Sequence, residues 1–314
     1  MQIEFVERKS AVLSPSSLSC LSDTATINLT AGCAHGCIYC YANGYSCRPD
    51  NNQIRVYSNL LPNLQNELKR KRKLPKCVYF SPSSDLFQPV PEILAIAYNM
   101  LKYLLENNFI VSFLTKGVIP ESHFELFQKY PNQVNAQIGL ISCNEEVQKI
   151  FEPQAAKSSI RVKQISRLIE FGIKTMVRID PIIPNFTDDK QTFNAICRSV
   201  ADCGVKHISA SMLFLRPAIK ETLKRSIADN VIYEKIIDSY LDFKRQPIRS
   251  SNSSIVPVPL EKRLTVYQRL DSIAKDYGLS LCICGCKNQD VSANLFNGYC
   301  KIVGISKVNN KGLF

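Results

Sequence analysis

Short apolar runs alternate with longer amphipathic stretches over most of this chain. The strand-like runs lie at residues 24–30, 77–81, 110–115, 134–141, 174–179 and 207–213. Apolar residues recur at helical spacing between them, at about 59–72, 91–107, 121–130, 158–171 and 188–203. Strand–helix alternation predicts a parallel sheet, and six such units predict an α/β fold, a partial (β/α)6 TIM-like barrel. Functional residues are then expected after the carboxyl ends of the strands.

The regular pattern loosens after about residue 214. A helical stretch near 230–245, a Ser-rich segment at 245–254 and another amphipathic stretch at 260–277 follow. We predict a lead-in at 1–22, a core barrel at 23–245 and a cysteine-rich C-terminal extension at 246–314. No apolar run reaches the ~18–20 residues of a membrane span, and the N-terminus lacks a signal-peptide core. We therefore expect a cytoplasmic protein that does not enter a membrane.

Three cysteines follow the first predicted strand in the pattern C-x3-C-x2-C: Cys33, Cys37 and Cys40. A closed iron–sulfur cube takes four ligands, so three thiolates leave one iron open for another molecule. A zinc knuckle or three buried thiols are the alternatives. Zinc would need a closed site with a fourth ligand nearby, for which His35 and Cys47 are candidates.

The triple-cysteine pattern resembles the signature of the radical S-adenosylmethionine (SAM) superfamily. The resemblance implies a 4Fe-4S cluster whose open iron chelates SAM. An electron, from a donor such as a flavodoxin or ferredoxin, then splits SAM to a 5′-deoxyadenosyl radical.

Further motifs follow the predicted strands at residues 83–92, 114–117, 141–144, 151–153 and 178–184. Together they resemble the radical SAM branch related to spore photoproduct lyase, often called DNA-repair-photolyase-like, over about residues 24–215. That resemblance implies cofactor contacts for Tyr39, Ser84, Asp85, Lys116, Ser142, Asn144 and Arg178. Glu152 and Arg161 carry over as pocket or packing residues.

Several of these residues have a simpler alternative. Asp85 is also placed to cap the helix that begins near Pro91, and Lys116 to be a solvated strand end. Glu152 and Arg161 are alternatively a surface ion pair, worth under about 1 kcal/mol.

The chain departs from that branch at one position. Where spore photoproduct lyase has its hydrogen-donating cysteine, three residues before the matching aspartate, this chain has Pro82. Cys77 on the same strand and Tyr41 beside the last cluster cysteine are the candidate catalytic residues. Thymine-dimer repair is therefore in doubt, whereas generation of the radical is not.

A second group of cysteines lies near the C-terminus: Cys282, Cys284, Cys286 and Cys300. Alternate residues of a strand face the same side, and Gly285 permits a tight bend. All-sulfur ligands suit iron–sulfur clusters or zinc. We favour an auxiliary iron–sulfur cluster over zinc or ordinary thiols. The other cysteines, Cys20 among them, have no partner spacing.

The net charge of +12 favours an acidic partner, with nucleic acid as the first candidate. One basic run spans residues 69–76 and should lie opposite the active site, where the next strand begins. A second basic group comprises Arg216, Lys220, Lys224, Arg225, Lys244, Arg245 and Arg249. It is the better candidate for holding phosphates.

We therefore predict a radical SAM enzyme that cleaves SAM reductively and abstracts hydrogen from a substrate, with a nucleic-acid base as the favoured target in repair or modification. A radical SAM enzyme acting on a peptide or small metabolite is one alternative. A non-catalytic metal-binding nucleic-acid protein is the other.

Overall fold

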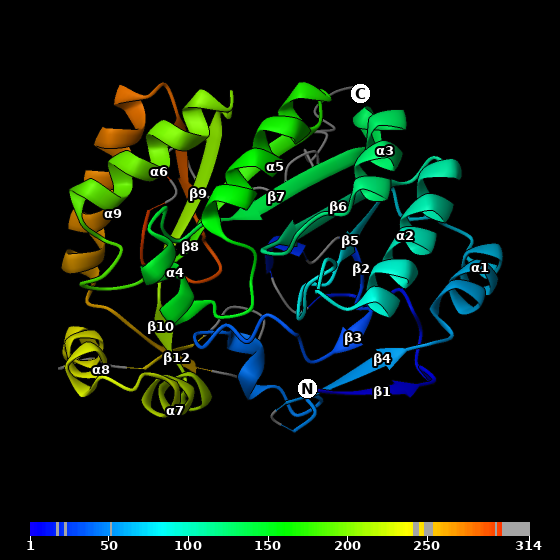
Figure 1. The fold of residues 1–314 in the computed structure, drawn as a ribbon, viewed down its shortest axis with the longest axis horizontal. Coiled ribbons are helices and arrows are strands. Elements are labelled where there is room, and N and C mark those ends of the chain that lie inside the picture. Colours follow the sequence, from blue (N-terminus) through cyan, green and yellow to red (C-terminus); the bar gives the residue numbers. More distant parts are fainter. Residues whose placement is uncertain are drawn as a thin grey trace, which may run out of the picture.

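A computed structural model describes residues 1–16, 19–21, 24–50, 52–240, 245–247, 254–292 and 294–296. Its centre is a seven-stranded parallel sheet in the order β13-β9-β8-β7-β6-β5-β2 (Figure 1). The strands are β2 (Ala25–Ile27), β5 (Cys77–Phe80), β6 (Ile110–Thr115), β7 (Val134–Gly139), β8 (Lys174–Ile182), β9 (His207–Met212) and β13 (Ser280–Ile283). The first six correspond to the predicted strands and follow one another in chain order. The predicted α/β partial barrel is confirmed.

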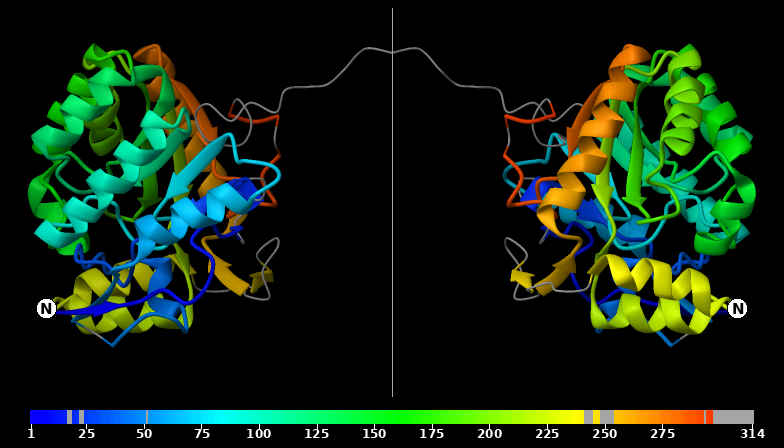
Figure 2. Two further views of the ribbon diagram at one scale, coloured as in Figure 1. Left: turned by 90° about the vertical axis from the view of Figure 1, so that its right-hand side faces the viewer. Right: turned by 90° about the vertical axis from the view of Figure 1, so that its left-hand side faces the viewer.

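Helices cover the outer face of this sheet (Figures 1 and 2). They are α1 (Leu60–Arg70), α2 (Pro91–Glu106), α3 (Glu121–Lys129), α4 (Glu145–Phe151), α5 (Ser158–Glu170), α6 (Lys190–Asp202) and α9 (Leu260–Asp276). Parallel sheets need both faces covered, and the central strand β7 is buried at all six positions. Polar residues inside it are paired: Asn135 Nδ2 donates to Ser112 Oγ at 3.2 Å.

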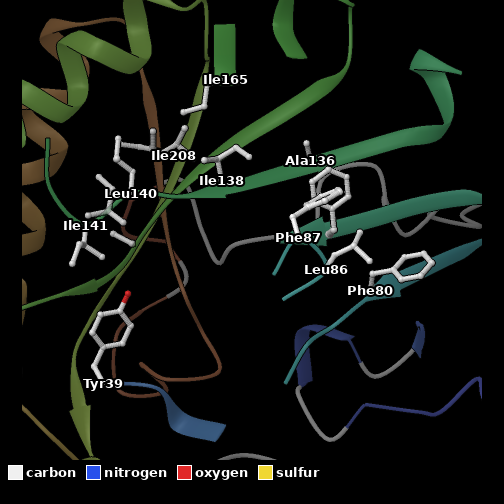
Figure 3. Close-up of a cluster of buried hydrophobic side chains, with 14 of the residues drawn as sticks. Tyr39, Phe80, Leu86, Phe87, Ala136, Ile138, Leu140, Ile141, Ile165 and Ile208 are labelled. Carbon is white, nitrogen blue, oxygen red and sulfur yellow. The ribbon is translucent and has the colours of Figure 1, made fainter. Parts of the chain in front are cut away.

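The core runs between the sheet and these helices. Figure 3 shows part of it, with Phe80 from β5, Ile138 from β7, Ile208 from β9 and Ile165 from α5 among the labelled side chains. These four side chains have no exposed surface. Tyr39, from the segment after β2, lies at the edge of the same cluster and so ties the cysteine loop to the core.

Smaller elements flank the carboxyl ends of the sheet. β1 (Gln2–Val6), β4 (Gln53–Tyr57) and β3 (Thr30–Ala31) form one small sheet, and β10 (Phe214–Leu215), β12 (Ser254–Pro257) and β11 (Gln246–Pro247) form another. Helices α7 (Pro217–Ser226) and α8 (Asn230–Ile237) lie near the second one, at the bottom of Figure 1. Short 3-10 turns are η1 (Ser19–Leu21), η2 (Tyr41–Gly44), η3 (Pro131–Gln133) and η4 (Asp238–Tyr240).

The structure differs from the sequence-based picture at several elements, including most strands of the two small sheets, which were not predicted. The run predicted at 24–30 divides into β2 and β3, which belong to different sheets. Helices α4 and α7 were not predicted. Part of the predicted C-terminal extension joins the barrel, because β13 pairs with β9 as a seventh strand. A domain boundary at residue 245 remains a prediction.

Candidate functional site

One cavity of about 510 Å³ lies where the strands of the main sheet end. Segments that follow β2, β5, β6, β9 and β13 contribute to its wall, together with the second half of β8. The predicted site residues on that wall are Cys33, Cys37, Tyr39, Cys40, Tyr41, Ser84, Asp85, Lys116, Arg178, Cys284 and Cys286. Residues from both ends of the chain therefore meet at one site.

The three cysteines Cys33, Cys37 and Cys40 lie on a tightly folded loop. Gly32 has φ +88°, and a Cβ there would stand 2.9 Å from the Gln53 carbonyl oxygen, so glycine is required. Farther along, Ile38 N donates to the Phe151 carbonyl at 3.0 Å and fixes the loop against α4.

These thiols suit a metal cluster. Burial raises the pKa of Cys37 to about 12 and also raises that of Cys33, so bare thiolates would be costly here. Metal ligation offsets that cost because thiolate is the form that binds. All three cysteines reach the same cavity, which leaves room on the unliganded side of a cluster for a second molecule. The donor set therefore fits a 4Fe-4S cluster with one open iron.

Asp85 joins the cysteine loop to two strand ends. Its carboxylate accepts hydrogen bonds from Phe87 N, Thr115 Oγ1 and Lys116 N at 2.7–2.8 Å, and His35 Nε2 lies 3.2 Å away. Burial alone would raise the pKa of Asp85, but His35 and the hydrogen bonds hold it below its ordinary value. Asp85 lies on the cavity wall, yet its own contacts are those of a positioning residue.

Tyr39 belongs to a second buried network. Its hydroxyl donates to Glu152, whose other carboxylate oxygen lies 2.5 Å from Arg161 Nη2. Arg161 also donates to the backbone carbonyls of Ala156 and Gly139, each at 2.8 Å. Both side chains of the Glu152–Arg161 pair have 0% exposure, so the surface-pair alternative is wrong.

Lys116 lies across the end of β7. A Cβ on Gly139 would stand 2.9 Å from Lys116 Cγ, so the absence of a side chain there makes room for the lysine. The ammonium group lies 5.7 Å from the centre of the Tyr39 ring, and the residue lines the cavity. Lys116 is thus directed into the site rather than being only a solvated strand end.

Three charged groups form a network on the wall beside these residues. Lys287 Nζ donates to both carboxylate oxygens of Asp180 at 2.6 and 2.8 Å, and Arg178 Nη2 donates to Asp180 Oδ2 at 2.9 Å. Burial opposes ionisation of Asp180, but Lys287 and Arg178 hold its pKa well below its ordinary value. Sequence reasoning included Arg178 and missed the other two. Asp180 could have been found because it directly follows a predicted strand, and Lys287 because it directly follows Cys286.

Of the two candidate catalytic residues, Tyr41 reaches the cavity and Cys77 does not. The Tyr41 hydroxyl donates to the carbonyl of Pro82, the position of the departure noted above. Cys77 is the first residue of β5, about 10 Å before the strand's carboxyl end at ~3.3 Å per residue. Its Sγ contacts Ser112 Oγ at 3.3 Å. Cys77 does not line the cavity, so this geometry does not support its catalytic role, which stays a prediction.

Two predicted cofactor contacts, Ser142 and Asn144, have structural partners instead. Asn144 Oδ1 accepts from the backbone N–H groups of Glu146 and Val147 and caps α4. Ser142 Oγ accepts from Asn144 N at 3.0 Å. Neither residue lies among those that line the cavity, so the structure does not support their predicted cofactor contacts.

The second cysteine group is brought to the cavity only in part. Cys284 and Cys286 line it, whereas Cys282 does not, and Cys282 Sγ lies 3.5 Å from the Ile208 carbonyl oxygen. Cys300 lies outside the described residues. Within the described ranges, no three Cys, His, Asp or Glu side chains converge as a single metal ion requires.

None of the helices in the described residues has the length and apolar character of a membrane span.

Comparisons with known proteins agree with this geometry. Residues 27–196 match the model of the radical SAM superfamily. The uncharacterized protein ORF301 of Acidianus two-tailed virus is 25% identical over 235 residues, which cover 70% of this chain and 77% of that protein. A radical SAM Nalpha-GlyT isomerase of Pseudomonas phage M6 is 25% identical over 153 residues, 48% of this chain and 32% of the isomerase.

A solved structure of a spore photoproduct lyase variant has the same fold. It superposes with a TM-score of 0.67 at 14% identity, covering 90% of this chain and 81% of that one.

Proposed function

Because the chain belongs to the radical SAM superfamily, we propose that it cleaves SAM reductively at a 4Fe-4S cluster held by Cys33, Cys37 and Cys40 and removes hydrogen from a substrate in the cavity. The observation that carries this proposal is the convergence of the three thiols on a cavity with room for a second molecule. Membership of this family makes the protein an enzyme, so the non-catalytic alternative is wrong.

The chain's own residues hold the reactants and exclude water. When bound, the cluster and SAM supply the one-electron chemistry that removes a hydrogen atom. Asp85 and Glu152 fix the cysteine loop. We propose that Lys116, which lines the cavity, pairs with the carboxylate of SAM. Reduction requires an electron donor, for which we propose a flavodoxin or ferredoxin.

Formation of 5′-deoxyadenosine tests this function. Anaerobically reconstituted protein, given SAM and dithionite, should release it, as measured by chromatography. Cys37→Ala should reduce release below about one hundredth of the parent value, since metal-site changes cost 10–100-fold even outside the ligands. Cys203→Ser, at the end of α6, is the control and should retain release. A reduced cluster that leaves SAM intact would refute the proposal.

For the substrate we propose nucleic acid. Arg216 lines the cavity and directly precedes α7, which carries exposed Lys220 and Lys224 at four-residue spacing. Residues spaced by four lie on one helix face, so the three cations lead from the outer surface to the cavity. The turn η2 of the cluster loop contacts this helix, since Asn43 Nδ2 donates to Thr222 Oγ1 at 3.4 Å.

The cavity wall also suits a flat base. Tyr45, Tyr79 and Phe214 line it, and aromatic rings give bases a stacking surface. A base would have to be single-stranded or flipped out of a duplex to enter. The other basic run, at 69–76, separates the end of α1 from the start of β5 and so lies at the amino ends of the strands.

The rival substrate class, a peptide or small metabolite, is favoured by Pro82. With proline at that position, the hydrogen-donating thiol of spore photoproduct lyase is missing, so thymine-dimer repair is not part of our proposal. A second iron–sulfur cluster on the C-terminal cysteines is part of it, supported by Cys284 and Cys286 on the cavity wall.

A further inference from the structure

A cysteine from the N-terminal lead-in meets the C-terminal cysteine group. Cys284 and Cys286 are buried together, and Cys20 and Cys282 pack against them. Of the four, Cys20, Cys284 and Cys286 line the cavity. Cys282 lies on β13, with Sγ 3.5 Å from the backbone carbonyl oxygen of Ile208. The three thiols that share the cavity are thus not the three that alternate along the sequence.

The segment with Cys284 and Cys286 is held rigidly. Cys284 N donates to the Ala210 carbonyl at 3.0 Å, and Asn288 Nδ2 donates back to the Cys284 carbonyl at 2.9 Å. The Asn288 side-chain oxygen accepts from Arg263 Nη1 at 2.9 Å and Tyr267 Oη at 2.8 Å. Hydrogen bonds from buried polar side chains therefore fix the turn at residues 284–288, as a preformed ligand loop requires.

The three sulfurs that meet here suit an iron–sulfur cluster, because thiolates are the ligands that such clusters take. A single metal ion is not favoured, because no three ligand side chains in the described ranges converge on one point. Cys33, Cys37 and Cys40 do not converge on one point either, as is expected where each sulfur binds a different iron of a cluster.

We propose that Cys20, Cys284 and Cys286 are ligands of a second iron–sulfur cluster on the wall of the active-site cavity. This assignment rests on the proposed second cluster and changes its ligand set, with Cys20 in place of Cys282. Such a cluster would join the lead-in before β2 to the end of β13, the two edge strands of the main sheet.

Iron counting on the full-length chain tests the assignment. The parent, reconstituted anaerobically, should bind about eight irons and the Cys33→Ala/Cys37→Ala/Cys40→Ala variant about four, one cluster's worth. Adding Cys20→Ala or Cys286→Ala to that variant should remove the remaining iron, sulfide and visible absorption. Adding Cys282→Ala, the matched control, should leave them. Far-UV circular dichroism checks that each variant is folded, and Cys20→Ala alone should lower the parent from about eight irons to about four.

The outcomes separate the two claims. About four irons in the parent and none in the triple variant would refute the second cluster itself. Iron that survives Cys20→Ala but is lost with Cys282→Ala would leave the second cluster standing and overturn the assignment of Cys20. Stoichiometric zinc in the triple variant would overturn the cluster chemistry.

Discussion

The buried carboxylate of Glu152 is one of the groups that hold the cysteine loop to the body of the barrel. It accepts the Tyr39 hydroxyl and pairs with Arg161, and the ion pair has no exposed surface. Glu152→Gln leaves the Arg161 guanidinium buried without a countercharge, which costs about 3–5 kcal/mol for a broken buried pair. We expect the free energy of unfolding to fall by this amount, measured by urea denaturation with far-UV circular dichroism.

A surface pair supplies the control for this prediction. Glu121→Gln removes the partner of Arg167, and the Glu121 side chain is 63% exposed. Its urea midpoint should match the parent's, because solvent already screens the pair. Equal midpoints for Glu152→Gln and Glu121→Gln would show that the buried network does not stabilise the fold.

Among single residues, sequence patterns predicted those that belong to local motifs. They did not predict whether a charged pair or a cysteine is buried against a distant part of the chain. Cys33, Cys37 and Cys40 are close in sequence, and all three reach the cavity. Glu152 and Arg161 are nine residues apart, a spacing that does not tell whether a pair faces solvent. Cys20 was missed because its neighbours lie almost at the other end of the chain. Only the folded sheet brings them together.

Among the elements, helix α7 begins directly after Arg216 on the cavity wall and carries the exposed Lys220 and Lys224. If it holds phosphates, Lys220→Gln/Lys224→Gln should weaken binding of a labelled single-stranded oligonucleotide. The slope of log affinity against log salt should fall by about 1.4, since each contact on a single strand contributes about 0.7. Fluorescence anisotropy between about 50 and 200 mM salt measures both quantities.

A matched pair of lysines in the other basic run controls for total charge. Lys69 and Lys73 are exposed near the amino ends of the strands, away from the cavity. Lys69→Gln/Lys73→Gln should leave affinity and slope unchanged. If both double variants lose affinity equally, binding reflects net charge alone and the role of α7 is refuted. If the parent does not bind, nucleic acid is removed as the substrate class.

Elements with strong periodicity were predicted well, and elements defined by distant pairing were not. Strands β5 to β9 and helices α1 to α3 lie within a few residues of their predicted bounds. Strand β13 has only four residues, and its place in the sheet depends on pairing with β9. That pairing carries Cys284, Cys286 and Lys287 to the cavity, which explains why their place beside the first cysteine group was not foreseen.

For the molecule as a whole, Asp180 links the middle of the sheet to its last strand. The carboxylate on β8 holds Lys287, which follows β13, and Arg178 on its own strand. The exposed fraction of the Asp180 side chain is 9%, and that of Lys287 is 22%. Charge pairing on the cavity wall therefore contributes to holding the segment after β13 against β8 as well as to shaping the site.

Asp180→Asn should make the protein less stable by about 3 kcal/mol at neutral pH, because two cations would remain in the cavity wall without their carboxylate. Burial opposes ionisation, yet Lys287 and Arg178 lower the folded-state pKa of Asp180 below the ordinary value of about 4. A lowered folded pKa stabilises fully above the unfolded pKa and loses this contribution as pH falls through the folded value. The difference in urea midpoint between parent and variant should thus stay constant from about pH 8 to about pH 5 and narrow only below about pH 4.

The control is Asp276→Asn, an exposed position at the end of α9, whose urea midpoint should match the parent's at every pH. A gap that already narrows between neutral pH and about pH 6 would assign the effect to another group.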